Sequence, residues 1–157
     1  MFVLASDAYD DVLAHAREDA PREACGVLVG DREDGSTRAT VARRVTNVAD
    51  APRVEYEMDP AEQLRVFEDA ESHGREVVGF YHSHPAGPPR MSDRDRSDAA
   101  WPGYTSLLVS LAGRPPFVGA WTWTGERFER ESVAVRDRRS AAELVGHATL
   151  DALVVDV

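Results

Sequence analysis

The sequence predicts a single mixed α/β (α+β) domain built around one sheet, and three observations support this class. The chain has 157 residues, which is the length of one ordinary domain. It is 43% hydrophobic, so it can bury a core of its own. Segments with helical spacing of apolar residues alternate with short apolar runs that end at turn residues. Both kinds of element therefore belong to one layered domain.

Capping residues and apolar spacing predict three helices. Ser6 is expected to cap a first helix that runs to about residue 20, where Pro21 follows. Asp59 precedes Pro60 in a strong start signal for a second helix, which stops at Gly74. This helix is expected to place three apolar residues on one side: Leu64, Phe67 and Ala70. A short third helix begins at Ser92 and ends before residue 102.

Strands are expected where short apolar runs lie between turn residues. The expected strands are 2–5 (at a sheet edge), 24–30, 37–46, 77–84, 105–111, 117–123 and 127–135. Asp34-Gly35 predicts the hairpin turn that joins the second of these to the third. The run at 77–84 is apolar on both faces, with Val78 and Phe80 expected on one of them, so we expect a central strand.

Composition and charge exclude several classes of protein. There are 28 acidic and 18 basic residues, and a net charge of −10 argues against a general nucleic-acid binder. No apolar run reaches the length of a transmembrane helix, and the N-terminus lacks the pattern of a secretory signal. The single cysteine, Cys25, excludes a disulfide scaffold. We therefore expect a cytoplasmic protein without nucleic-acid or membrane partners.

All of the basic residues are arginine, and the chain contains no lysine. A GC-rich genome produces this bias, and actinobacteria share it. Together with the acidity, it also fits a halophilic archaeal source, where high salt screens the repulsion between carboxylates. The composition leads to the hypothesis that the protein needs molar salt to stay folded.

The most informative segment is His82-Ser83-His84-Pro85, followed after a proline-rich loop by Ser92-x-x-Asp95. The two histidines are two residues apart on an expected strand, so both imidazoles project from the same face. Buried imidazoles need partners, and one shared metal ion satisfies both. Two histidines and one aspartate form a three-ligand set that leaves a position for water, which is typical of catalytic zinc.

Each part of this pattern also has a purely structural interpretation. A His-x-His pair alone is weak evidence for a metal, and Ser92-x-x-Asp95 alone is the signature of a helix start. Cys25 lies near an acidic residue but opens an apolar strand, so we expect inert packing. Three more histidines lack partners at ligand spacing and are expected on the surface: His15, His73 and His147. The tryptophans are expected in the core or in a groove.

The pattern His-x-His, seven residues, then Ser-x-x-Asp resembles the signature of the JAMM (MPN+) metallopeptidases, and the proline after the second histidine also matches. The segment from Pro21 to Gly30 looks like the family's upstream element, which carries a glutamate, here Glu23. The resemblance covers about residues 3–135. It implies a curved, mostly antiparallel sheet flanked by helices, of the cytidine deaminase-like type.

The resemblance also implies a role for each site residue. His82, His84 and Asp95 would bind one zinc ion per chain, and water would fill the fourth position. Glu23 would act as general base and then as general acid. Ser92 would donate a hydrogen bond to the developing oxyanion. Pattern alone does not select Glu23 from the other glutamates.

Family members that keep all of these residues are mostly isopeptidases that act on ubiquitin-like proteins. A minimal prokaryotic chain with this composition resembles the haloarchaeal desampylases, which remove small ubiquitin-like modifiers (SAMPs) from lysine side chains and cleave linear fusions. One alternative is a peptidase that trims the C-terminus of a ubiquitin-like sulfur carrier, and another is a non-catalytic scaffold. Residues 47–58 occupy the place of a substrate-guiding insertion, although they can equally be a plain connection.

We expect a catalytic domain over residues 1–135, followed by a C-terminal tail over 136–157. The tail opens with an arginine cluster and continues into an apolar segment. It can be a docking helix or a segment that packs on a partner.

Overall fold

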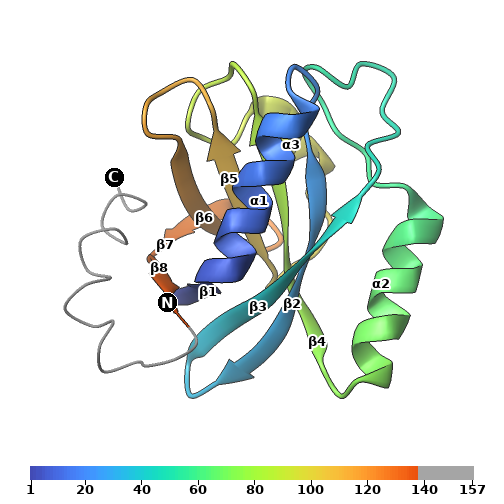
Figure 1. The fold of residues 1–157 in the computed structure, drawn as a ribbon, viewed down its shortest axis with the longest axis vertical. Coiled ribbons are helices and arrows are strands. Elements are labelled where there is room, and N and C mark those ends of the chain that lie inside the picture. The colour runs from blue at the N-terminus through green and yellow to red at the C-terminus, as the bar shows by residue number, and fades with distance from the viewer. Residues whose placement is uncertain (138–157) are drawn as a thin grey trace.

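A mixed sheet of eight strands forms the centre of the computed structural model, which describes residues 1–137 (Figure 1). The strands lie in the order β7-β6-β5-β4-β2-β3-β1-β8. Their bounds are β1 (Phe2–Ala5), β2 (Cys25–Glu33), β3 (Ser36–Val45), β4 (Glu76–His84), β5 (Thr105–Ser110), β6 (Phe117–Trp123), β7 (Phe128–Glu131) and β8 (Val133–Arg136). Four neighbouring pairs are antiparallel and three are parallel. The predicted fold class is confirmed.

Three helices flank this sheet in the part of the chain that the structure describes. They are α1 (Ser6–Asp19), α2 (Pro60–Ser72) and α3 (Asp93–Asp98). Helix α1 crosses one face and buries Val12 and Ala16 in a core cluster with Leu28 of β2. Helix α2 packs beside the other face, where Val66 joins a second cluster with Val27 (Figure 1). The sheet therefore has two apolar layers, one between the sheet and α1 and one between the sheet and α2.

Two turn and capping signals work as the sequence predicts. Asp34 and Gly35 have φ values of 43° and 78°, so the β2–β3 hairpin turns through two left-handed residues. The Asp59 carboxylate accepts hydrogen bonds from the backbone N–H of Ala61 and Glu62 at 2.9 and 3.0 Å, which caps α2.

Three local expectations are wrong. Strand β1 is not at an edge, because it lies between β3 and β8 and runs parallel to both. Ser6 is the first helical residue of α1 rather than its cap, and the preceding Ala5 makes no side-chain capping bond. The expectation for α2 is wrong at Leu64, which is 59% exposed; Ala70 is buried as expected, Phe67 packs against the same cluster, and Val66 is the other buried position. The pairing of β1 with β8 and the rotation of α2 about its own axis both depend on tertiary contacts, which local sequence patterns do not show.

The two faces of β4 are also assigned differently from the expectation. Gly79 pairs with Leu28, but the next residue of β2 pairs with Val77, so Val78 is an extra residue that bulges out of the ladder. A bulge inverts the alternation of side chains on one side of it. Val78 therefore packs in the α1 layer, whereas Phe80 lies in the α2 layer. His82 and His84 keep the face of Phe80 but not that of Val78.

The last expected strand, 127–135, is divided into β7 and β8 at Ser132. The two parts lie at opposite edges of the sheet. Strand β8 extends one residue past the predicted domain boundary at 135/136, which stays a prediction. The tail from residue 138 onward, including His147, lies outside the described residues. None of the helices described combines the length and apolar composition that a membrane crossing requires.

Candidate active site

The expected site residues meet at one end of the sheet, where β2 begins and β4 ends. These strands are antiparallel and Cys25 pairs with His82, so the chain before β2 lies beside the last residues of β4. The Ser83 backbone N–H donates to the Ala24 carbonyl at 3.0 Å, and the Ser83 hydroxyl accepts from the Ala24 N–H at 2.8 Å. These two bonds hold Glu23 next to the histidines.

His82, His84 and Asp95 form a buried cluster around one carboxylate oxygen. Asp95 Oδ2 lies 3.2 Å from His82 Nε2, 3.1 Å from His84 Nε2 and 2.9 Å from the backbone N of Ser92. Burial by itself would raise the pKa of Asp95. When the two rings are protonated, their N–H groups donate to Asp95. Together with the charge of His82 and the hydrogen bond from the Ser92 N–H, they outweigh burial and hold the pKa of Asp95 well below its usual range.

The hydrogen-bond partners of His84 determine which of its two ring nitrogens carries the proton and which presents a lone pair to Asp95. Its Nδ1 lies 2.9 Å from the Pro88 carbonyl oxygen, which can only accept, so Nδ1 carries a proton. In the neutral ring, Nε2 then presents a lone pair to Asp95 Oδ2. Two electron-rich atoms 3.1 Å apart need a proton or a cation between them. A histidine that donates its other N–H to a backbone carbonyl is the usual arrangement of a metal ligand.

Glu23 completes the cluster from the other strand. One ligand atom from each of Glu23, His82 and His84 lies within 4.8 Å of the others, and all three residues are buried. Glu23 Oε1 is buried without a hydrogen-bond partner in the described residues. Burial raises the pKa of Glu23 to about 7. The unpartnered oxygen and the lone pair of His84 are the features that a bound metal ion and its water would satisfy, so the donor set fits a metal site.

Ser92 and Asp95 combine the two interpretations that the sequence left open. Ser92 Oγ accepts from the Asp95 N–H at 3.0 Å, while Asp95 Oδ2 accepts from the Ser92 N–H at 2.9 Å. This reciprocal pair is a capping box at the start of α3. The same Asp95 oxygen also faces both histidines. The cap therefore fixes the carboxylate in the cluster, and the two roles coexist.

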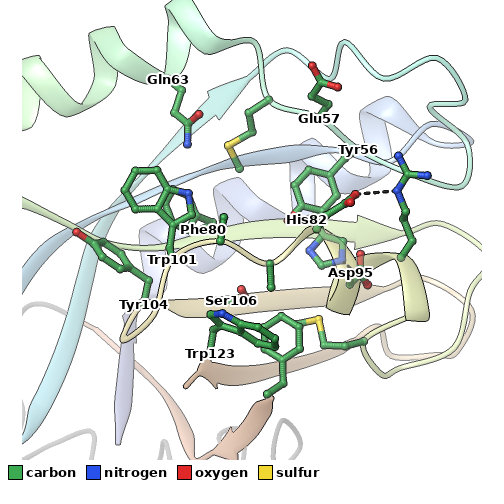
Figure 2. A pocket seen from close by; sticks show the side chains of 17 residues that line it. Tyr56, Glu57, Gln63, Phe80, His82, Asp95, Trp101, Tyr104, Ser106 and Trp123 are labelled. Carbon is green, nitrogen blue, oxygen red and sulfur yellow. Dashed lines mark hydrogen bonds and ion pairs between the residues drawn. The ribbon is translucent and has the colours of Figure 1, made fainter. Parts of the chain in front are cut away.

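A cavity of about 370 Å³ adjoins His82 and Asp95 (Figure 2). Its far wall is aromatic, with Trp101 and Tyr104 beside Phe80 (Figure 2). Tyr56 covers the end of the cavity at His82, on which its ring stacks with centroids 4.5 Å apart. The cavity is thus open space between the polar cluster and an aromatic wall.

Sequence reasoning missed Tyr56 and Asn47, because both lie in the segment 47–58 that it treated as irregular. Asn47 pairs with Met58 in an isolated bridge that closes this segment into a loop. A single aromatic or asparagine in a loop carries no periodic signal. The only available hint was the position of the segment, which the resemblance compares with a substrate-guiding insertion.

The expectation for Cys25 agrees with the structure. Its side chain is fully buried and its thiol donates to the Val45 carbonyl at 3.4 Å. Burial raises the pKa of this thiol to about 12, so it stays protonated at neutral pH. Cys25 therefore packs in the core and is not a nucleophile.

Comparisons with known proteins agree with this geometry. Residues 5–141 match the family described as prokaryotic homologues of the JAB domain. The chain is 49% identical over 136 residues to a desampylase of Haloferax volcanii, covering 84% of this chain and 94% of the relative. It is 37% identical over 110 residues to the CysO-cysteine peptidase of Mycobacterium tuberculosis, covering 70% and 73%. A solution structure of a Desulfitobacterium hafniense protein aligns with a TM-score of 0.81 and 31% identity, covering 88% of this chain and 94% of that one.

Proposed function

Because the chain belongs to the prokaryotic homologues of the JAB domain, we propose that it is a zinc-dependent isopeptidase that acts on ubiquitin-like modifiers. It is a JAMM-type metallopeptidase similar to desampylases. The observation that carries the proposal is the buried group of Glu23, His82 and His84, whose glutamate oxygen has no partner in the described residues. The proposed substrate is the amide between the modifier's C-terminal glycine and a lysine side chain, or the peptide bond of a linear fusion.

In this proposal His82, His84 and Asp95 hold one zinc ion. When bound, zinc lowers the pKa of water and polarises the scissile carbonyl. The backbone carbonyl of Pro88 accepts from His84 Nδ1, so in the neutral ring the lone pair available for coordination is on Nε2. The Ser92 N–H holds the Asp95 carboxylate in place, so the ligand set is fixed by neighbours that do not themselves bind metal.

Glu23 is the proposed base. Its carboxylate takes a proton from the attacking water, whose oxygen adds to the carbonyl carbon. As the C–N bond breaks, Glu23 returns the proton to the leaving amine. A pKa of about 7, raised by burial, suits both directions of transfer near neutral pH. Proton transfer by a positioned group contributes roughly 10²–10⁴-fold to a rate.

Ser92 is the proposed oxyanion donor. Its oxygen accepts the Asp95 N–H, which leaves the hydroxyl hydrogen to point at the carbonyl oxygen of the substrate. We further propose that the modifier's tail lies extended in the cavity, between the segment 47–58 and the aromatic wall. A cytoplasmic location stays a prediction.

A second candidate function is favoured by one observation, the 37% identity to the CysO-cysteine peptidase. In that case the leaving group would be the amine of a cysteine attached to a ubiquitin-like sulfur carrier. The chemistry at Glu23 and the metal ligands would be the same, and only the leaving side of the substrate differs.

The test is a cleavage assay with two substrates, a modifier–lysine isopeptide and a carrier–cysteine adduct. We expect zinc-dependent cleavage of the isopeptide that a chelator abolishes and added zinc restores. The variant Glu23→Gln should keep its zinc, measured by mass spectrometry, and lose at least about 10²-fold in kcat. Cleavage of the cysteine adduct alone would favour the second function. Full turnover by metal-loaded Glu23→Gln would refute the assignment of the base.

A further inference from the structure

Asn47 is a buried side chain with four hydrogen bonds, and they divide into two pairs. Its Nδ2 lies 3.0 Å from the Glu23 carbonyl oxygen and 3.1 Å from that of Glu55. Its Oδ1 lies 3.0 Å from the backbone N of both Ala49 and Glu57. Carbonyls only accept and amide N–H groups only donate, so these partners fix the orientation of the side-chain amide. Both the donor and the acceptor positions of this buried side-chain amide are therefore occupied by hydrogen bonds.

The backbone of Glu23 depends on this neighbourhood. Glu23 precedes β2, so no strand ladder holds it. Its N–H donates to the Pro52 carbonyl at 2.7 Å, and its carbonyl accepts from Asn47. Both sides of the Glu23 residue are therefore tied to the segment 47–58. Its carboxylate, in contrast, has an oxygen without a partner among the described residues.

The same segment covers the cavity. Tyr56, Glu57 and Met58 line it, and the Tyr56 ring stacks on His82. The bond from Asn47 to the Glu55 carbonyl and the bond from the Glu57 N–H flank Tyr56 on both sides. Asn47 thus joins Glu23, two residues before β2, to the loop that covers His82.

We propose that Asn47 is a positioning residue that aligns Glu23 with the metal ligands through the bond to the Glu23 carbonyl. The proposal rests on the proposed function, in which Glu23 is the base. An error of about 1 Å in the placement of a catalytic group can cost roughly 10²-fold in rate. A purely structural role would need only the three bonds within the loop, to Ala49, Glu55 and Glu57.

The substitution Asn47→Asp removes both donor bonds, to the carbonyls of Glu23 and Glu55, and keeps both acceptor bonds, from the N–H groups of Ala49 and Glu57. The loop thus keeps two of its three bonds, whereas the Glu23 carbonyl loses its bond to Asn47. We expect kcat on a linear modifier fusion to fall at least about tenfold while KM stays within about threefold. Zinc content should be unchanged, because the ligands are untouched. In hydrogen–deuterium exchange of the metal-free protein, the Glu23 N–H should lose protection while those of Ala49 and Glu57 keep theirs.

Two comparisons distinguish positioning from general destabilisation. Val12→Ala removes a buried contact in the α1 layer, on the other face of the sheet, and should lower the melting temperature without a comparable loss of kcat. In a Glu23→Gln background, Asn47→Asp should add less than about a twofold loss, because the two residues act as one unit. The proposal is overturned if Asn47→Asp lowers kcat by the same factor in the Glu23→Gln background as in the wild type. It is also overturned if Asn47→Asp lowers the kcat of the wild type no more than Val12→Ala does.

Two further outcomes are decisive. If Asn47→Asp does not fold, Asn47→Ala serves in the same cycle, and additive losses again overturn the proposal. If the wild type cleaves no modifier substrate, the proposed function fails. The exchange measurement then still decides the coupling, because equal protection of the Glu23 N–H in wild type and variant contradicts it.

Discussion

The buried titratable side chains of Glu23 and His15 differ in their hydrogen-bond partners. Glu23 has an oxygen without a partner in the described residues. His15 is 4% exposed, its Nδ1 lies 2.7 Å from the Tyr81 hydroxyl, and its Nε2 lies 3.0 Å from Asp19. His15 was expected on the surface, and this expectation is wrong. It follows Val12 by three residues and Ala8 by seven, so the helical stripe could have indicated its burial.

The protonation of His15 should affect stability in a defined pH range. Burial lowers the pKa of His15, and the neighbouring Asp19 only partly opposes this, with Arg44 acting with burial and Glu18 against it. The unfolded chain takes up a proton below the ordinary pKa of 6.5 while the folded protein resists it. The stability contribution is therefore complete above pH 6.5 and is lost as the pH falls through the lower folded-state pKa.

We predict that His15→Gln reduces this acid sensitivity. Glutamine can still bond to the Tyr81 hydroxyl but does not titrate. Urea unfolding at about pH 7.5 and about pH 5, with chelator and constant salt, should show a smaller loss of unfolding free energy in the variant than in the wild type. Parallel losses in the two proteins would assign the acid sensitivity to other groups.

At the scale of elements, the pairing of β4 with its neighbours aligns the site. Gly79 lies beside the bulged Val78 and pairs with Leu28 on one side and Thr105 on the other. A Cβ at Gly79 would lie 2.5 Å from the Thr105 carbonyl oxygen, which is a backbone atom that cannot move alone. The absence of a side chain here permits β5 to approach the strand that carries His82.

We predict that Gly79→Ala destabilises the fold by about 1–3 kcal/mol, because the two strands must separate. Gly113→Ala is the matched control, since its Cβ would meet its nearest atom at 3.7 Å, an ordinary contact. Urea denaturation with unchanged m-values measures both. Equal stability of the two variants would mean that β4 and β5 adapt without cost.

These elements also show how far the sequence leads. Local signals predict the Asp59 cap, the hairpin at Asp34 and the central strand, because each depends on residues close in the chain. The spacing of the two histidines and Asp95 is likewise local. The bulge at Val78 and the contacts of Asn47 depend on partners far away in the chain, so no pattern predicts them. Glu23 needed the family resemblance for the same reason.

At the scale of the whole molecule, one sign of charge dominates. The net charge is −10 over 157 residues. Among residues 1–137, exposed arginines pair with exposed carboxylates at 2.7 Å in four places: Arg43–Asp69, Arg44–Glu18, Arg94–Asp98 and Arg127–Glu129. Exposed pairs contribute only about 0–1 kcal/mol each. Salt weakens these pairs slightly, whereas it screens the repulsion among all the excess carboxylates, so the net effect of salt is set by the repulsion.

We predict that the protein gains stability as KCl rises from about 0.1 M to about 2 M, since the screening length falls from about 10 Å to below about 3 Å. A variant with Asp10→Asn, Glu68→Gln and Glu71→Gln lowers the net charge from −10 to −7 at exposed helix positions. If repulsion is the cause, thermal melts followed by circular dichroism should show a smaller salt-induced rise in this variant than in the wild type. An equal rise in both proteins would attribute the effect to strengthened burial of apolar surface, and a wild type equally stable in dilute buffer would contradict the halophilic hypothesis.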